Sequence, residues 1–297
     1  MAFPGPASPG ATLAPLRRGS GDPTFQMATD GAIWRTTLLD SGAVSTRVFR
    51  TGVASVSAQA WGPGAAEFLE ALPAYLGVDD DWSDFTPTEP VVVEAARRAA
   101  HLRLGRTGRV LEAVIPAIIE QRVPGADAFR AWRQLLNKYG TPAPGPAPAR
   151  MRVFPPAEVW RHIPSWEYHR ANVDPGRART VVGCAQRAAA LERLTARTPA
   201  AAREALTSLP GVGVWTAAEV AQRAFGDADA LSVGDYHVPK MIGWTLVGHP
   251  MDDDAMVRLL EPMHPHRHRV VRLLEVSGLA YEPRRGPRLP VQHIHAL

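Results

Sequence analysis

The pattern of apolar and polar positions changes near residue 90. Between residues 31 and 61, short β-favouring stretches are separated by Asp-Ser-Gly and Thr-Gly turn signals. This spacing is typical of an antiparallel meander. Residues 63–77 then place apolar side chains at helical spacing between a proline and a glycine, which predicts a helix. The first hundred residues therefore indicate a small α+β domain.

After Pro90 the apolar pattern is helical, and we expect no further strand. A Pro-rich connector, residues 141–156, interrupts this half, and we expect it to cross the molecule from one group of helices to the next. The predicted fold class is α+β, with a small antiparallel β-rich domain followed by an all-α region. The expected divisions are a flexible leader (1–20), an N-terminal α+β domain (21–100), a helical region (101–282) and a basic tail (283–297).

The amino-acid composition excludes several kinds of site and cofactor. The 297 residues include 33 Lys+Arg and 29 Asp+Glu, and the net charge of +4 suits a polyanionic partner without requiring one. No apolar run approaches the ~20 residues that span a bilayer, and the N-terminus does not resemble a signal peptide, so we expect a cytoplasmic protein without a membrane segment. The single cysteine, Cys184, excludes an intrachain disulfide, a four-cysteine zinc site and a cysteine-ligated iron–sulfur cluster. We therefore expect no cofactor.

One segment predicts a helix, a tight hairpin and a second helix. The helical pattern of residues 201–209 runs into Pro210-Gly211-Val212-Gly213, and a second helical pattern follows over residues 214–225. Two glycines one residue apart let the backbone turn sharply and present N–H groups beside the positive end of the second helix. Such a turn can bind a DNA phosphate without reading sequence. It can equally be a plain connection between antiparallel helices.

Asp235 stands at the start of the next predicted helix, residues 235–248. A carboxylate in this position is ordinarily an N-cap, which contributes ~1 kcal/mol. Taken alone, Asp235 would be interpreted as a cap. Its spacing of roughly twenty residues from the hairpin makes it a candidate catalytic residue.

The run LPGVGVWTA, followed at this distance by VGDYHVPK, resembles the helix-hairpin-helix signature of the DNA glycosylase superfamily. The similarity is greatest to the bacterial 3-methyladenine DNA glycosylase II branch and extends from about residue 20 onward. It implies a monomer that binds double-stranded DNA containing damaged bases, with Asp235 as the catalytic carboxylate at the mouth of the pocket for a flipped nucleotide. It also implies DNA contacts from the hairpin residues Gly211, Val212, Gly213, Val214 and Thr216, and a possible monovalent cation on the carbonyls of Leu209 and Val212.

The resemblance also bears on strand cleavage. Branches with lyase activity carry a lysine immediately before the Thr-Ala of this motif, where this chain has Trp215. The only lysines are Lys138 and Lys240, and neither occupies that position. Without an amine nucleophile no imine forms with C1′. We therefore expect a monofunctional hydrolase for alkylated, 3-methyladenine-type bases, in which Asp235 stabilises the developing positive charge on the sugar and orients or deprotonates water.

The expected base pocket departs from that branch at two positions. Trp215 would form an aromatic wall, with Tyr236 beside it, although Trp215 could instead be a core residue. Glu219 stands where the branch has a tyrosine, and could attract a cationic base or simply pair with Arg223. His266 stands where the branch has a second stacking tryptophan.

Two further groups take their expected roles from their positions. Gln121 and Arg122 fall where the superfamily inserts side chains into the gap left by the flipped nucleotide, although they could simply lie on a helix surface. His264, His266 and His268 alternate, and alternate helical positions do not share a face, so we expect a basic rim along DNA and no metal site.

Two rival functions remain: a DNA-binding module without catalysis, and a glycosylase for uracil or for an oxidised or deaminated base.

Overall fold

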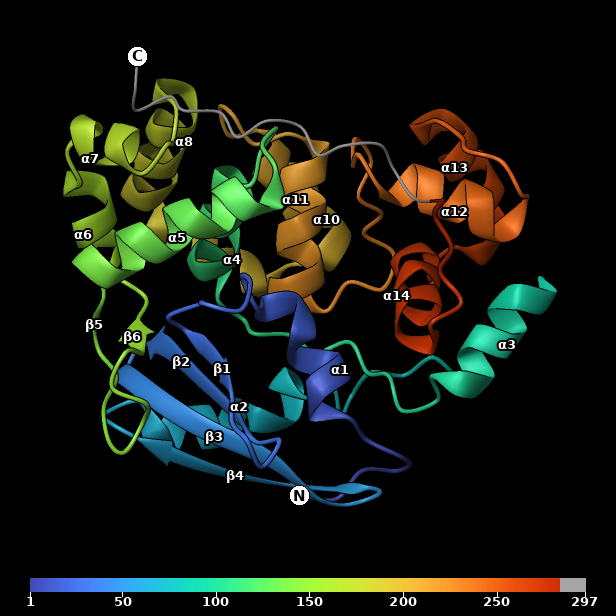
Figure 1. Cartoon of the computed structure of the whole chain (residues 1–297), viewed down its shortest axis with the longest axis horizontal. Helices are drawn as coiled ribbons and strands as arrows, with labels where there is room; N and C mark the ends of the chain where they lie inside the picture. Colours follow the sequence, from blue (N-terminus) through green and yellow to red (C-terminus); the bar gives the residue numbers. More distant parts are fainter. Residues whose placement is uncertain (284–297) are drawn as a thin grey trace.

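The computed structural model describes residues 1–283, whose apolar side chains form three main cores. The first belongs to an N-terminal sheet, the second to a central group of helices and the third to a smaller group near the C-terminal end. Figure 1 shows the sheet in blue below the central helices, with the smaller group in orange and red to one side. The α+β fold class predicted from the sequence is therefore confirmed.

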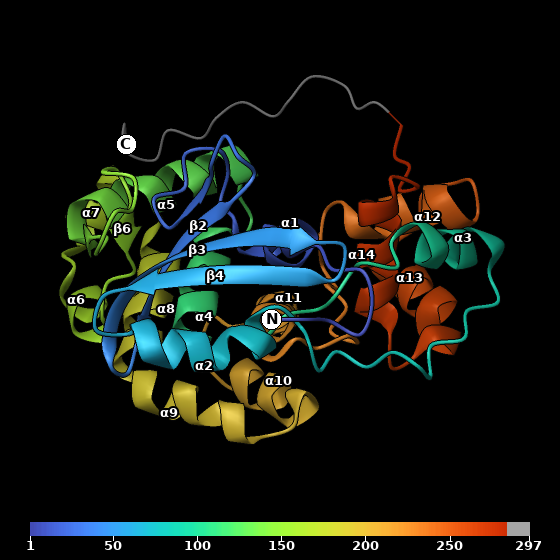
Figure 2. The ribbon, with the colours of Figure 1, turned by 90° about the horizontal axis from the view of Figure 1, so that it is seen from below.

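The N-terminal sheet is an antiparallel meander, as predicted. Neighbouring strands follow one another in sequence, with Ile33 opposite Val48 on the central pair. One helix lies against the sheet and buries Phe68 and Leu72 in the same core (Figure 2). The elements are β1 (Phe25–Met27), β2 (Ile33–Leu39), β3 (Gly42–Gly52), β4 (Ser55–Trp61) and α2 (Ala65–Tyr75).

Residues 1–20 are packed against the body of the protein, so the expectation of a flexible leader is wrong. They form α1 (Pro9–Leu13) and a 3-10 turn, η1 (Ala14–Leu16). Phe3 and Leu13 are buried in the core of the sheet, and the Phe3 N–H donates a hydrogen bond of 2.8 Å to the Ala54 carbonyl. Apolar side chains spaced among the prolines find a surface to cover, and their burial offsets the entropy lost on ordering the segment.

The Pro-rich connector also differs from the expectation. It forms a short antiparallel ladder, β5 (Thr141–Pro142) and β6 (Arg152–Val153), and it leaves and re-enters the same group of helices. It is docked on the sheet, where the Ser45 hydroxyl donates to the Pro144 carbonyl and the Arg152 N–H donates to the Pro23 carbonyl. The predictions of no further strand and of a crossing segment are therefore wrong, because the polar edge and face of the sheet supply partners for this backbone.

The central group of helices surrounds α4, which buries every residue except Glu112. A helix that is apolar on all sides needs neighbours on all sides, and the surrounding helices provide them. The group consists of α4 (Val110–Ile119), α5 (Gly125–Tyr139), α6 (Ala157–His162), α7 (Ser165–Arg170), α8 (Pro175–Gln186), α9 (Ala188–Glu192), η2 (Arg193–Ala196), α10 (Pro199–Thr207), α11 (Val214–Val220) and its π-helical continuation η3 (Ala221–Phe225).

The smaller group of helices includes one that the sequence placed in the N-terminal domain. Helix α3 (Pro90–Arg98) packs against α14 (Arg267–Ser277), so the boundary predicted at residue 100 does not follow the packing. A buried ion pair of 2.5 Å between Arg269 and Asp80 ties the same region together. The other members are α12 (Val238–Leu246), α13 (Asp253–Leu260) and η4 (Glu261–Met263). Residues 284–297 of the predicted basic tail lie outside the described residues.

The buried position of Cys184 on α8 leads to a testable prediction. Burial raises the pKa of its thiol to about 11, so the reactive thiolate is scarce at neutral pH. We expect Cys184 to react slowly with Ellman's reagent at pH 8 in the folded protein. In guanidinium chloride we expect a rapid reaction that releases one equivalent of the reagent's coloured thiolate. Rapid reaction of the folded protein would contradict the assigned core position.

Candidate DNA-binding and catalytic site

The hairpin between α10 and α11 depends on a close backbone approach. Gly211 has φ +83°, and a Cβ on it would lie 2.1 Å from the Thr180 hydroxyl oxygen of α8. Only glycine satisfies both conditions. Gly213 has open space around it, and it caps α11 without a side chain that could accept the first N–H groups. These N–H groups are therefore available to an anion.

The side chains of the hairpin divide between the core and the surface. Val212 and Thr216 are buried, whereas Val214, the first residue of α11, is 59% exposed. The buried pair anchors the turn, and the exposed backbone beside Val214 faces solvent. Of the five hairpin residues predicted to contact DNA, Gly211, Gly213 and Val214 are therefore exposed, and Val212 and Thr216 anchor them from below.

Gln121, at the end of α4, braces this hairpin. Its side-chain amide donates to the Gly211 carbonyl (2.9 Å) and to the Thr216 hydroxyl (2.7 Å). The amide is therefore used inside the protein. Arg122 follows in the left-handed conformation, with φ 56°, and its side chain is exposed. Of the two residues predicted to fill the gap in the DNA, Arg122 is the one that faces outward.

Asp235 is held between the two groups of helices. Its Oδ1 accepts the backbone N–H groups of His237 (2.7 Å) and Val238 (3.0 Å), the N-cap and the first residue of α12, so Asp235 caps this helix from two positions before the N-cap. Its Oδ2 accepts the indole N–H of Trp215 (3.1 Å), the second residue of α11. The same carboxylate is therefore bonded both to the start of α12 and to the helix that follows the hairpin.

The aromatic residues beside Asp235 have different surroundings. Trp215 is partly buried and donates its indole N–H to Asp235, so it is not a fully buried core residue. Tyr236 is 62% exposed, and the Lys240 ammonium lies 3.6 Å from the centre of its ring. The Trp215 ring is thus bonded to the carboxylate, whereas Tyr236 presents a ring face to the Lys240 ammonium.

Glu219 lies one helical turn beyond Trp215 and is engaged within the protein. It forms an ion pair of 2.7 Å with Arg223, and it accepts a hydrogen bond of 2.7 Å from the Ser232 hydroxyl. Both members of the pair are largely buried, and the Glu219 carboxylate contributes to a raised pKa for Arg223 against the effect of burial. The pairing with Arg223 that the helical spacing allowed is present, but it is shielded from solvent.

The three alternating histidines serve separate contacts and do not form one rim. His264 bonds Asp229 (3.0 Å). His266 bonds Asp84 (2.9 Å), accepts from Arg269 and packs on Phe85. These contacts bind His266 to the segment before α3.

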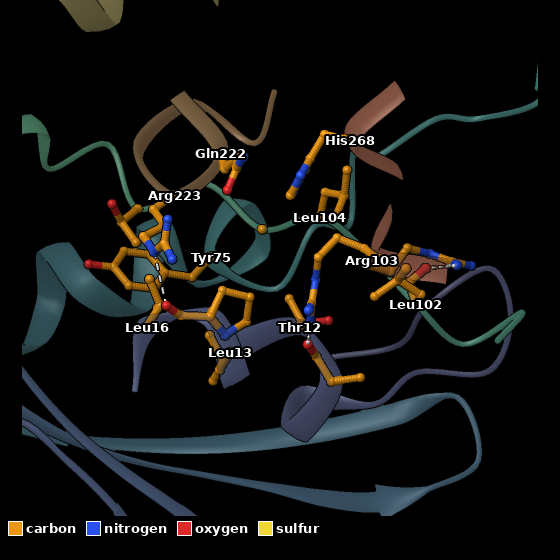
Figure 3. A pocket seen from close by; sticks show the side chains of 15 residues that line it. Thr12, Leu13, Leu16, Tyr75, Leu102, Arg103, Leu104, Gln222, Arg223 and His268 are labelled. Atoms are coloured by element: carbon orange, nitrogen blue, oxygen red, sulfur yellow. Dashed lines mark hydrogen bonds between the residues drawn. The ribbon is translucent and has the colours of Figure 1, made fainter. Parts of the chain in front are cut away.

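His268 instead faces a cavity where the N-terminal segment, residues 102–107, η3 and α14 meet (Figure 3). Thr12 and Gln222 also line this cavity, whereas Asp235 does not. Burial, together with the neighbouring arginines, lowers the pKa of His268 well below its ordinary value of 6.5, so its imidazole is neutral near neutral pH. The cavity lies among the three cores and is separate from the candidate site.

The arrangement of sheet, central helices and smaller helical group is shared with several solved DNA glycosylases. The 3-methyladenine DNA glycosylase from Archaeoglobus fulgidus matches with a TM-score of 0.76 at 17% identity, over 94% of this chain and 98% of that one. The 8-oxoguanine glycosylase/lyase from Clostridium acetobutylicum gives a TM-score of 0.70 at 14% identity, over 91% and 92%. The 3-methyladenine DNA glycosylase of Schizosaccharomyces pombe, solved with abasic DNA, gives 0.53 at 14% identity, over 67% and 97%.

This chain has the helix-hairpin-helix DNA glycosylase fold. The fold expected from the sequence resemblance is thereby confirmed. No protein-family model matches the sequence. No curated protein matches it either. At these identities the likeness concerns the fold, and it includes proteins named for two different lesions.

Within this glycosylase fold, both lysines are accounted for. Lys138 on α5 pairs with Glu167 at 2.7 Å, and Lys240 stacks on Tyr236. Among residues 1–283, no group of three or more His, Cys, Asp or Glu side chains could hold a metal ion. In the same part of the chain, no helix is long and apolar enough to cross a membrane.

The expected monovalent cation stays a prediction. The Leu209 carbonyl already accepts the Val212 N–H at 3.0 Å within the hairpin turn. A carbonyl oxygen has two lone pairs, so one remains for a cation. The donor set is compatible with a weakly held ion beside the turn.

Sequence reasoning missed the residues that hold the turn before Asp235. The Asp253 carboxylate accepts the Gly234 N–H (2.8 Å), and Gln222 donates to the Ser232 hydroxyl (2.8 Å). Three consecutive aspartates at 252–254 are typical of a helix start, and nothing in that pattern indicates that the middle one faces another loop. A pairing between segments that are far apart along the chain leaves no local signal.

The bond between Trp215 and Asp235 can be tested by its contribution to stability. Trp215→Phe keeps an aromatic ring but removes the N–H donor, and we expect it to lower the free energy of unfolding by about 1 kcal/mol, because a partly exposed carboxylate loses one hydrogen bond. Chemical denaturation measures this change. Trp166→Phe is the matched control, since Trp166 is 64% exposed on α7. Equal effects of the two substitutions would contradict the assigned bond.

Proposed function

We propose that this protein is a monofunctional DNA glycosylase that hydrolyses the N-glycosidic bond of a damaged base, with Asp235 as the catalytic carboxylate. The observation that carries the proposal is the bond from the Trp215 indole to Asp235. It joins a carboxylate at the start of one helix to the second residue of the helix that begins at a backbone turn suited to DNA phosphate. A helix cap alone would need no such partner.

The fixed carboxylate suits the chemistry of this reaction. Positive charge develops on the sugar as the C–N bond breaks, and a negative charge already in position stabilises it without reorganisation. Three N–H donors hold the Asp235 carboxylate, and the residue remains partly exposed. Oδ2 accepts one of these donors and has a second lone pair. Asp235 can therefore face the sugar and also orient a water molecule.

The hairpin supports the proposal from the DNA side. The base must leave the stack before it is cut, and this costs a few kcal/mol. A phosphate held by the N–H groups beside Gly213 would anchor the strand close to Asp235, because Trp215 links the two elements. Arg122 is exposed near the braced hairpin and is our candidate for the side chain that enters the gap.

For the base itself we propose an alkylated purine of the 3-methyladenine type. The support is the Trp215 indole beside the negative charge of Asp235, which favours a flat cationic group, whereas one face of Tyr236 is already covered by the Lys240 ammonium. Glu219 adds less than the sequence suggested, because Arg223 offsets its charge. His266 is assigned no role in the pocket, since its contacts lie elsewhere.

Base release under single-turnover conditions tests the proposal. Duplexes would carry 3-methyladenine, 7-methylguanine or ethenoadenine, and a second set would carry uracil, hypoxanthine or 8-oxoguanine. We expect release from the alkylated set, and a loss of at least about 100-fold in Asp235→Asn, which keeps a cap oxygen but loses the charge. No release above the Asp235→Asn level on any duplex, with DNA binding intact, would favour a non-catalytic DNA-binding protein. Release confined to the second set would assign a different lesion.

Strand cleavage provides a separate prediction. Because Trp215 replaces the lyase lysine, product DNA should remain intact until it is treated with alkali, and borohydride should trap no covalent complex. Gel analysis of end-labelled duplexes measures both. Lys240→Ala is the useful companion variant, since Lys240 lies on Tyr236 close to Asp235. Direct nicking that disappears in this variant would show that Lys240 acts as the amine.

A further inference from the structure

The turn that leads into Asp235 is bonded at its middle by a residue from another helix. The Gly234 N–H donates to Oδ1 of Asp253 at 2.8 Å. Asp253 is the first residue of α13, and the capping of that helix is supplied by its neighbour Asp252, which accepts from the Ala255 N–H. Asp253 is therefore not needed as the cap of its own helix.

The start of the same turn is fixed by the helix that follows the hairpin. The Ser232 hydroxyl donates to Glu219 and accepts from Gln222, while the Ser232 carbonyl accepts the Asp235 N–H at 3.2 Å. The Val233 N–H donates to the Leu231 carbonyl at 2.9 Å, and its side chain packs on the core of the smaller helical group. With residues 232 and 233 held in this way, Gly234 is the position at which Asp253 acts.

Gly234 is the residue of the turn with the greatest conformational freedom. It has φ +92°, a region that other residues rarely adopt, and the space beside its Cα is open: a Cβ there would have Trp215 as its nearest neighbour, at 3.9 Å. A glycine without a fixed partner would let the backbone, and with it the Asp235 carboxylate, move relative to Trp215. A displacement of about 1 Å at a reacting group can cost on the order of 100-fold in rate.

We infer that Asp253 is a positioning residue for the glycosylase reaction: by accepting the Gly234 N–H it fixes the turn that aims Asp235. The inference rests on the proposed function of Asp235. Asp253 acts through the backbone and does not touch the sugar or the base. Its oxygen, and not its negative charge, is what the turn requires.

Three variants separate these roles. Asp253→Asn retains an oxygen acceptor and loses the charge, Asp253→Ala loses both, and Asp254→Ala removes a neighbouring exposed carboxylate from the same helix. We expect the single-turnover rate constant to fall about tenfold in Asp253→Ala, with unchanged affinity for DNA, and to remain within about twofold of the parent in the other two. A loss in Asp253→Asn as large as in Asp253→Ala would overturn the inference, because charge would then be the cause. An unchanged rate constant in Asp253→Ala would overturn it as well.

A second measurement does not depend on activity. The indole N–H of Trp215 reports directly on the position of Asp235, so its exchange with solvent can be followed by NMR in each variant. We expect faster exchange in Asp253→Ala and parental exchange in Asp253→Asn and Asp254→Ala. Parental exchange in all three would overturn the inference even if no base were released, whereas a missing activity with the expected exchange pattern would count against the proposed function alone.

Discussion

The bond between the Trp215 indole and the Asp235 carboxylate is the interaction on which the candidate site depends. It joins α11, which packs into the central group of helices, to the start of α12, which packs into the smaller group. Each group has its own apolar core, and burial of those cores stabilises each group without fixing one relative to the other. A directional contact at the boundary does fix them, and here it uses the two residues proposed to act on the substrate.

Directional polar contacts recur wherever parts of this protein meet. Arg223 of η3 donates to the Pro15 carbonyl at 2.9 Å, and Arg18 pairs with Glu120 at 2.7 Å, so the N-terminal segment is tied both to η3 and to the end of α4. The Arg18 side chain is only 6% exposed, and this burial lowers its pKa. A buried charge left without its partner is costly, so these pairs restrict the ways in which the parts can be assembled.

The hairpin and the turn before Asp235 share one arrangement, in which a glycine allows a backbone shape and a distant side chain fixes it. Gly211 allows the approach to Thr180, and Gln121 then bonds its carbonyl. Gly234 allows the turn before Asp235, and Asp253 bonds its N–H. Glycine provides access to these conformations but does not select them, because its own backbone is the most freely varying of all residues. Selection comes from the bond.

The sequence predicted the meander, the change to helices after Pro90 and the hairpin, and it singled out Asp235 as a candidate. Periodicity, turn residues and motif spacing are local properties, so they can be read along the chain. The sequence could not show that residues 1–20 are packed, that α3 joins α14, or that His266 bonds Asp84 while Glu219 pairs with Arg223 inside the protein. Those outcomes depend on which segments pack against each other in the folded protein. The same side chain can line a pocket or form an internal hydrogen bond, because its role is set by neighbours that are distant in sequence. The cap at Asp235 could be expected from the sequence, but only the tertiary structure shows its second bond. One oxygen of the carboxylate bonds the start of α12, and the other bonds Trp215 beside the hairpin.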